Sequence, residues 1–262
     1  MKDKKSVILY KSLMHYVKDT NHLSEVCSKL NKSKFLAIDT EFIREKTYWP
    51  KLCLIQVFNG EDKIIIDPLV KGLDLKPFFK ILSNNEIVKI FHSGRQDIEI
   101  FYNLTKKIPK NIYDTQIAAM VCGFGDSIGY ENLVSQLLGK KIDKTSRLTN
   151  WSNRPLSKKQ INYAISDVTH LFEIYPLIKD KIINNKRESW FKEEIRILIS
   201  KKTYDLNPDD SWKRLKYRNL NKNSIGILIE LAKWREIKAQ EKDVPRGNIT
   251  VSYTHLTLPT KA

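Results

Sequence analysis

The chain has 262 residues, of which 41% are hydrophobic, and its formal net charge is +16. This composition excludes a largely disordered chain, because the apolar residues suffice for one good-sized domain and part of another. The excess of Lys and Arg favours a polyanionic partner, with nucleic acid ahead of an anionic membrane surface. Solubility combined with a Lys-rich compositional bias is the alternative explanation of the charge.

The cysteines and the apolar segments indicate the cellular compartment. Cys27, Cys53 and Cys122 are scattered and show no CxxC spacing, so they are expected to be buried thiols in a reducing compartment. The apolar stretch near the N-terminus is too short for a signal peptide, and no apolar run is long enough to span a bilayer. We therefore expect a cytoplasmic protein with no membrane partner. No obligate protein partner is evident.

Apolar periodicity predicts an α/β domain with a mixed central sheet flanked by helices. Strands are expected at residues 7–10, 35–42, 52–58, 63–67 and 87–91. Helices are expected around 23–30, 73–82 and 96–104, and almost throughout from Asp114 onward. Asn59-Gly60 is a turn signal, so the strands on either side of it are expected to be antiparallel.

The C-terminal part predicts a second, smaller unit. A helix is expected at 186–202, the sequence NPDD at 207–210 indicates a linker, and a further helix is expected at 220–242. We place the boundary near Asp205, which gives a first domain at 1–205 and a helical unit at 206–250. Residues 251–262 fit neither unit. They resemble the translation of a transposase sequencing adapter, so this tail is expected to be non-native.

The stretch FLAIDTEF at 35–42 organises the first domain. Four apolar residues lead directly into Asp39, Thr40 and Glu41, which is typical of a buried strand that ends in polar residues. Side chains alternate along a strand, so Asp39 and Glu41 project to one side. Two adjacent carboxylates repel each other, and a hard divalent cation such as Mg²⁺ relieves that repulsion. A solvated strand end with two surface acids is the alternative.

Three more polar residues are candidates for the same site. Asp97 follows the strand expected at 87–91 and lies in the first turn of a helix, where the helix dipole alone would favour an acid. Tyr163 and Asp167 are four residues apart, which places them on one face of a helix. That spacing is common by chance. A buried polar pair beside an apolar stripe nevertheless needs partners, and a metal cluster would supply them.

Taken in order, Asp39-Thr40-Glu41, Asp97 and Tyr163-x-x-x-Asp167 resemble the three motifs of the four-acid 3′→5′ exonuclease superfamily, in the branch with Tyr in the third motif. Longer matches resemble the ribonuclease D family: IDTEFIREKTYWPKLCLIQVF, FHSGRQDIEIF, YDTQIAAM and DKTSRLTNWSNRPLSKKQINYAISDVTHL. Residues 219–250 are similar to the start of the helical HRDC module that follows the nuclease in this family. Gln96 and Asn150 stand where relatives often carry an acid.

The resemblance implies a ribonuclease H-like exonuclease fold, a partial HRDC module and hydrolysis with two divalent metal ions, Mg²⁺ first and Mn²⁺ second. It implies that Asp39, Glu41, Asp97 and Asp167 hold the ions and that Tyr163 orients the attacking water. Residues expected to contact substrate are Thr40, Phe42, His92, Lys144, Arg147, Trp151 and Arg154. For Phe42 core packing is the alternative, for His92 a plain turn residue, and for the basic segment before the third motif a solvated loop.

The implied function is trimming of RNA 3′ ends, above all those of tRNA precursors, with release of nucleoside 5′-monophosphates. A 3′→5′ DNA exonuclease or repair factor would use the same metal site, and a basic RNA-binding protein with a degenerate nuclease fold is a further alternative. Loss of a metal-binding acid would favour the last alternative, but all four acids are present. Preference between RNA and DNA oligonucleotides of one sequence separates the first two.

Overall fold

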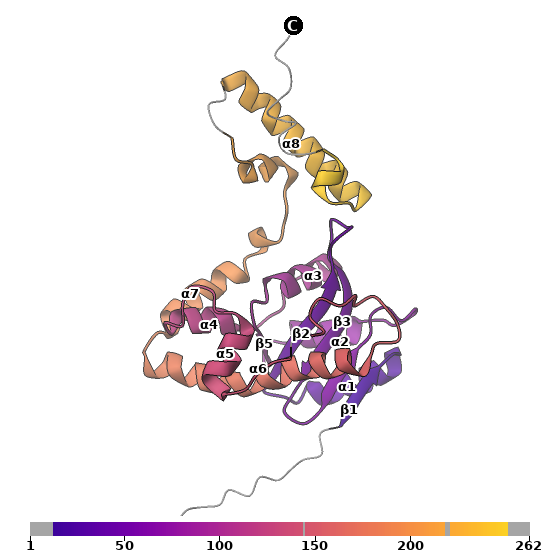
Figure 1. The fold of residues 1–262 in the computed structure, drawn as a ribbon, viewed down its shortest axis with the longest axis vertical. Coiled ribbons are helices and arrows are strands. Elements are labelled where there is room, and N and C mark those ends of the chain that lie inside the picture. The colour runs from indigo at the N-terminus through magenta and orange to yellow at the C-terminus, as the bar shows by residue number, and fades with distance from the viewer. Residues whose placement is uncertain (1–12, 144, 218–220, 251–262) are drawn as a thin grey trace, which may run out of the picture.

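The computed structural model describes residues 13–143, 145–217 and 221–250. Its centre is a six-stranded sheet with the order β1-β4-β3-β2-β5-β6 (Figure 1). Strand β3 is antiparallel to both of its neighbours, whereas the other pairs are parallel, so the predicted mixed sheet is confirmed. The strands are β1 (Met14–Val17), β2 (Phe35–Ile43), β3 (Lys51–Phe58), β4 (Lys63–Ile66), β5 (Val88–Phe91) and β6 (Ile112–Asp114).

Helices cover both faces of the sheet. One face packs against α1 (Thr20–Leu30), α2 (Lys76–Ser83) and α3 (Arg95–Thr105). The other face packs against α4 (Thr115–Val121), α5 (Tyr130–Leu138) and the long α6 (Lys158–Asn184), which runs across the front of the sheet in Figure 1. Along β2, Leu36 and Ile38 join the first core and Ala37 joins the second. Asp39 and Glu41 continue the side of Ala37 and therefore face α6.

Most predicted elements are confirmed, with small shifts at their ends. The strand expected at 7–10 lies outside the described residues, and the first described strand is β1. Helix α7 (Glu188–Leu198) is shorter than the 186–202 expected. The sequence pattern does not indicate β6, because three residues are too few to show alternation. The predicted turn is confirmed: Gly60 has φ +97°, and a Cβ there would lie 2.7 Å from the ring of Phe172.

The C-terminal part contains a short 3-10 helix, η2 (Pro208–Arg214), packed along α8 (Lys222–Lys242). This confirms a helix where 220–242 was expected. The assignment of 206–250 to a partial HRDC module and the domain boundary near Asp205 stay predictions, and the tail at 251–262 lies outside the described residues. In the described part of the chain, no helix has the length and apolar character needed to cross a membrane.

One end of α8 meets the connection between β2 and β3, here called the hairpin tip (residues 44–50), as Figure 1 shows. The ring of Tyr48 is buried, and its hydroxyl donates a hydrogen bond to Glu236 of α8. That hydroxyl also accepts from Gln240 Nε2 at 3.1 Å and from Arg246 Nη2 at 2.9 Å. Glu236 is in turn paired with Arg246 and Arg214. A compact charged cluster therefore joins the hairpin tip to α8.

A second polar cluster fastens the loop that precedes α6. Arg154 forms a two-pronged ion pair with Asp67, with Nε–Oδ2 at 2.6 Å and Nη2–Oδ1 at 2.8 Å. Its guanidinium also donates to the backbone carbonyls of Cys53 and Trp151. Because the hydroxyl of Tyr16 donates to Asp67 as well, this buried carboxylate connects β1, the end of β4 and the loop.

Replacing Arg154 by Ala is expected to lower the free energy of unfolding by about 3 kcal/mol, because Asp67 would remain buried without its cation. Urea unfolding followed by circular dichroism measures the loss. Lys158→Ala, at an exposed lysine nearby, is the control and should change little. Unchanged stability together with weaker RNA binding would contradict the structural role and favour a substrate contact for Arg154.

Stability is also expected to depend on pH through Glu236. Burial by itself would raise the pKa of this carboxyl, but hydrogen bonds from Arg246 and Tyr48 lower it to about 2 from the usual 4.5. The folded form therefore gains stability from Glu236 above about pH 4.5 and loses it as the pH falls towards about 2. Glu236→Gln should lower the free energy of unfolding at neutral pH. The difference in free energy of unfolding between this variant and wild type should shrink as the pH falls from about 4.5 towards about 2. Glu241→Gln on the same helix should show no such change.

Candidate active site

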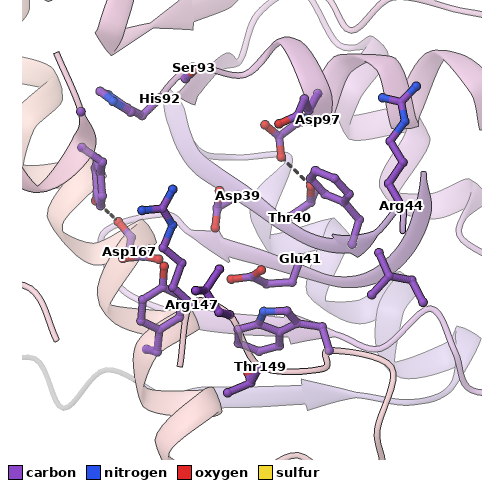
Figure 2. A pocket seen from close by; sticks show the side chains of 18 of the residues that line it. Asp39, Thr40, Glu41, Arg44, His92, Ser93, Asp97, Arg147, Thr149 and Asp167 are labelled. Carbon is purple, nitrogen blue, oxygen red and sulfur yellow. Dashed lines mark hydrogen bonds between the residues drawn. The ribbon is translucent and has the colours of Figure 1, made fainter. Parts of the chain in front are cut away.

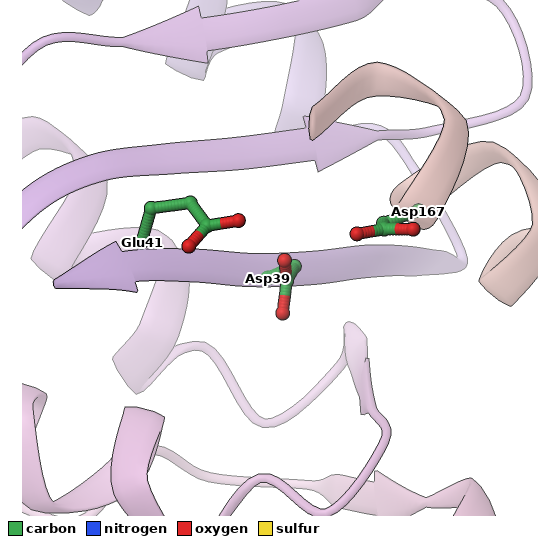
Figure 3. Close-up of side chains that lie close together, drawn as sticks. All are labelled: Asp39, Glu41 and Asp167. Atoms are coloured by element: carbon green, nitrogen blue, oxygen red, sulfur yellow. The ribbon is translucent and has the colours of Figure 1, made fainter. Parts of the chain in front are cut away.

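The site is built on the end of β2. Asp39 pairs with Gln56 of β3 in regular register, and the register shifts between Glu41 and Phe42. Such an irregularity bends a strand and redirects its side chains, and it is frequent beside active sites. Asp39 and Glu41 point to the same side of β2, as the alternation of the sequence predicts. Figure 3 shows both carboxylates on that strand, facing α6.

Asp167 of α6 completes a group of three carboxylates. One oxygen each of Asp39, Glu41 and Asp167 can be chosen so that all lie within 4.8 Å of one another. Figure 3 shows Asp167 reaching toward the two acids of β2 from the helix that crosses the sheet. A Ser157–Gln160 capping box starts this helix one residue before Lys158 and fixes where its turns lie. The i, i+4 spacing therefore brings Tyr163 and Asp167 to the site, as expected.

Asp97 approaches from the other face of the sheet. It lies in the first turn of α3, and its Oδ1 accepts a hydrogen bond from Thr40 Oγ1 at 2.5 Å, drawn in Figure 2. The turn before it is tight: a Cβ on Gly94 would lie 2.6 Å from Cβ of Phe91, so only glycine fits. Asp114, at the end of β6, holds this turn by accepting from the backbone N–H groups of residues 93 and 94.

The four acids lie close together, with Asp97 and Asp167 buried and Asp39 and Glu41 half-buried, and loss of solvent is the largest cause that raises the pKa of each. The pKa of Asp39 lies well above its usual value, because neighbouring Asp97, Glu41 and Asp167 add repulsion. Burial and the same kind of repulsion raise the pKa of Glu41 to about 9, while Arg147 opposes the shift. The pKa of Asp97 rises to about 6 and that of Asp167 to about 7.

These side chains suit a divalent metal. All the donors are carboxylate oxygens, which hard cations such as Mg²⁺ and Mn²⁺ prefer. Oδ1 of Asp167 is buried and has no hydrogen-bond partner among the described residues. A buried acceptor left without a partner is costly, and a cation would satisfy it. The raised pKa values agree with this, because a bound cation would favour the ionised form of carboxyls that burial disfavours.

The acids lie in an open cleft of about 1010 Å³. Thr40, Phe42, His92, Arg147 and Trp151, which were expected to contact substrate, all line it. Figure 2 shows Arg147 projecting from its loop toward Asp167 and Glu41. Phe42 also packs against the core, so core packing and contact with substrate are compatible roles for this side chain.

Two of the expected substrate residues are not placed in the cleft. Arg154 is not among the residues that line it, because its guanidinium is held by Asp67 and by backbone carbonyls. Lys144 lies outside the described residues. Of the described cations in the basic segment before the third motif, Arg147 lines the cleft and Arg154 does not.

His92 is held at the cleft by a neighbour that the sequence did not indicate. Its Nδ1 lies 3.0 Å from Thr115 Oγ1, and Thr115 Oγ1 lies 3.1 Å from the carbonyl oxygen of Phe91. The Nε2 atom of His92 is buried and has no hydrogen-bond partner among the described residues. Burial lowers the pKa of this imidazole. The backbone of Ile128 opposes that shift. The imidazole therefore borders the cleft as a neutral ring whose Nε2 is turned away from solvent.

Sequence reasoning also missed Tyr130. It lines the cleft, and its ring lies tilted against that of His92 with ring centroids 5.1 Å apart. Its hydroxyl donates a hydrogen bond to the backbone carbonyl of Asp167. Tyr130 opens α5 just after Gly129, and a lone aromatic at a helix start gives no signal of such a role. Its contact holds α6 in place at the residue that carries the third carboxylate.

Comparison with known proteins gives a consistent result. A family profile described as 3′-5′ exonuclease matches residues 14–183. Ribonuclease D of Bartonella henselae is 45% identical over 240 residues, which cover 92% of this chain and 59% of that protein. Ribonuclease D of Zymomonas mobilis is 45% identical over 239 residues, with 91% and 61% covered. The chain thus spans about three fifths of the length of these curated relatives.

A solved structure gives the same answer for the fold. Escherichia coli RNase D, described as an exoribonuclease involved in structured RNA processing, superposes with a TM-score of 0.85 at 32% identity. The match covers 92% of this chain and 64% of that one. The expected ribonuclease H-like exonuclease fold is therefore confirmed. Because the profile spans the sheet, both helical layers and all four acids, this chain belongs to the 3′-5′ exonuclease family.

Proposed function

We propose that the protein is a ribonuclease D-like exoribonuclease that trims RNA 3′ ends, with tRNA precursors as its substrates and nucleoside 5′-monophosphates as products. The observation that carries this proposal is the convergence of Asp39, Glu41 and Asp167 from β2 and α6, with Asp97 beside them. The net charge of +16 supports a nucleic-acid substrate, and the relatives' names favour RNA over DNA. A cytoplasmic location is part of the same proposal.

Each of the four acids has a proposed role in holding metal ions. Asp39, Glu41 and Asp167 would hold one divalent ion, and Asp97 would hold a second, with Mg²⁺ preferred over Mn²⁺. When bound, such ions lower the pKa of an attacking water and stabilise the leaving oxygen. Within the cleft, the four carboxylates fix where a scissile phosphate can lie, because their crowded negative charge must be neutralised before an anionic substrate enters.

Tyr163 is assigned to orienting the attacking water. Burial raises the pKa of this phenol above its usual value, and the nearby Asp167, Glu41 and Asp39 raise it further. The hydroxyl therefore stays protonated at neutral pH and acts as a hydrogen-bond donor, not as a base. His92 lines the cleft and is assigned to a contact with the terminal nucleotide. Phe42 is half-buried and provides apolar surface for the terminal base, and stacking of that kind contributes roughly 1–3 kcal/mol per base. Trp151 is buried and supports Tyr163, since their ring centroids lie 6.1 Å apart.

The first test removes a single metal-binding acid. Asp167→Asn keeps the size of the side chain but takes away one charge, so we expect at least about a 100-fold loss of activity. Time courses with 3′-labelled and with 5′-labelled RNA, with Mg²⁺ and with EDTA, follow the shortening. Wild type should shorten RNA stepwise from the 3′ end, and EDTA should abolish this.

Asp180→Asn is the matched control, since it makes the same change at an exposed position of the same helix. It should leave the rate unchanged. A gel shift without shortening, unaffected by EDTA, would show an RNA-binding protein and overturn the proposed function. Equal or faster shortening of a DNA oligonucleotide of the same sequence would replace the exoribonuclease with a DNA exonuclease.

A second test addresses Arg147. Its charge lowers the pKa of Glu41 and of Asp167, which places the guanidinium within electrostatic reach of both acids. We assign it to the substrate phosphate. Arg147→Ala should raise KM for RNA by roughly tenfold, the size of a lost charged hydrogen bond. The Mg²⁺ concentration for half-maximal rate should stay the same or fall, because a positive charge near the metal ligands is gone.

Arg147→Lys keeps the charge and should lie between wild type and Arg147→Ala in KM. Steady-state rates at several RNA and Mg²⁺ concentrations give both quantities. A higher Mg²⁺ requirement for Arg147→Ala with an unchanged KM would contradict the assignment, because it would place Arg147 in support of the metal ligands.

A further inference from the structure

One wall of the cleft is formed by a segment that contributes no metal-binding acid. Residues 42–47, at the end of β2 and the start of the hairpin tip, line the cleft in an unbroken run. Lys46 is exposed there next to the exposed Glu45, while the guanidinium of Arg44 is paired with Glu99, so Lys46 is the cation of this run that is open to substrate. The run leads away from Asp39 and Glu41, so an RNA strand whose 3′ end is at the acids would pass along it. A positive charge on this wall is suited to the phosphates upstream of the terminal nucleotide.

The hairpin tip is fastened to α3 on one side. The guanidinium of Arg44 forms two hydrogen bonds of 2.9 Å to the carboxylate of Glu99. The ammonium of Lys106 lies 5.8 Å from the ring centroid of Trp49. These contacts join the tip to the nuclease domain, but they leave the backbone of residues 48 and 49 to other partners.

Those backbone partners come from the far end of the chain. Oδ1 of Asp243 accepts hydrogen bonds from the N–H of Tyr48 at 3.0 Å and from the N–H of Trp49 at 2.9 Å. Asp243 is the C-cap of α8 and has a left-handed backbone, with φ 48°. Asp and Asn tolerate that conformation better than most residues. The buried hydroxyl of Tyr48 meets Glu236 of the same helix, so α8 holds both the backbone and the side chain of the tip.

We propose that α8 sets the position of the cleft wall through Asp243, which makes Asp243 a positioning residue for RNA binding at Lys46. This inference rests on the proposed function, because it concerns how RNA is held at the same site. The carboxyl of Asp243 touches neither the acids nor the cleft. It acts by accepting hydrogen bonds from two N–H groups of the hairpin tip. Because Lys46 belongs to the same tip, these hydrogen bonds also determine where the wall that carries Lys46 lies. Helix α8 thereby contributes indirectly to RNA binding.

The test compares Asp243→Ala with Asp243→Asn in the full chain. The Asn amide keeps an oxygen acceptor and suits the left-handed conformation, so it should preserve both hydrogen bonds; the Ala methyl removes them. Asp243→Ala should raise KM for an oligoribonucleotide by roughly fivefold or more, with kcat within about twofold of wild type. Hydrolysis of a nucleoside 5′-monophosphate p-nitrophenyl ester, which is too small to reach the wall, should not change. Asp243→Asn should resemble wild type with both substrates.

Amide hydrogen exchange gives a readout that does not depend on activity. Asp243→Ala should speed exchange at the amides of Tyr48 and Trp49, while the amides of β2 at 37–41 stay protected. If the protein has no nuclease activity at all, the proposed function fails, and exchange still decides whether Asp243 holds the tip. Unchanged exchange at residues 48 and 49 would overturn the positioning role by itself.

Kinetics can overturn the inference in other ways. Equal loss on the RNA and on the small ester would show general damage to the site, and equal effects of Ala and Asn would show that the acceptor oxygen is not what matters. Should Asp243→Ala fail to fold, Lys46→Ala tests the same wall at an exposed residue. It should raise KM for RNA without changing ester hydrolysis, and an unchanged KM for RNA would remove the basis of the proposal.

Discussion

Crowding of negative charge at the end of β2 is the constraint on which the rest of the structure depends. Asp39, Glu41 and Asp167 come from two elements and meet within 4.8 Å, and Asp97 adds a fourth acid from the other face of the sheet. Burial raises the pKa of all four carboxyls, and repulsion from the other acids raises those of Asp39 and Glu41 further, so ionising these groups costs the fold stability that a cation would restore. The fold supplies the compensating stability elsewhere, in two apolar cores on the two faces of the sheet.

The acids are held by neighbours that do no chemistry themselves. Thr40 donates to Asp97, Asp114 fixes the turn that precedes α3, and Tyr130 binds the backbone of α6 at Asp167. Each of these contacts joins two segments that are far apart in the sequence. Electrostatic catalysis needs charges that are already in place when the substrate arrives, because reorganising them would cost much of the gain. The arrangement around the cleft meets that need with hydrogen bonds outside the group of acids.

The sequence predicts the parts of this arrangement that follow from local periodicity. Alternation along β2 puts Asp39 and Glu41 on one side, and helical spacing puts Tyr163 with Asp167; both are confirmed. Contacts between residues that are far apart in the sequence cannot be predicted from local periodicity. Arg154 carries the same charge as Arg147 and lies seven residues away, yet Asp67 holds it outside the cleft. The three residues of β6 were too few to show alternation, and nothing near Tyr48 in the sequence indicates that its partners lie at Glu236 and Asp243.

The site thus has two parts that are held in place by different kinds of interaction. The acids proposed to bind metal stand on β2, α3 and α6, and apolar residues of these elements belong to the two cores, so apolar packing holds their backbone in place. The surfaces that would grip RNA are a hairpin tip and a loop, held mainly by the polar contacts of Asp243, Glu236 and Arg154. Contacts of this kind weaken when one partner loses its charge, whereas apolar packing does not depend on charge. Conditions that disturb these contacts should therefore weaken substrate binding before they disturb the chemistry, and KM should respond earlier than kcat.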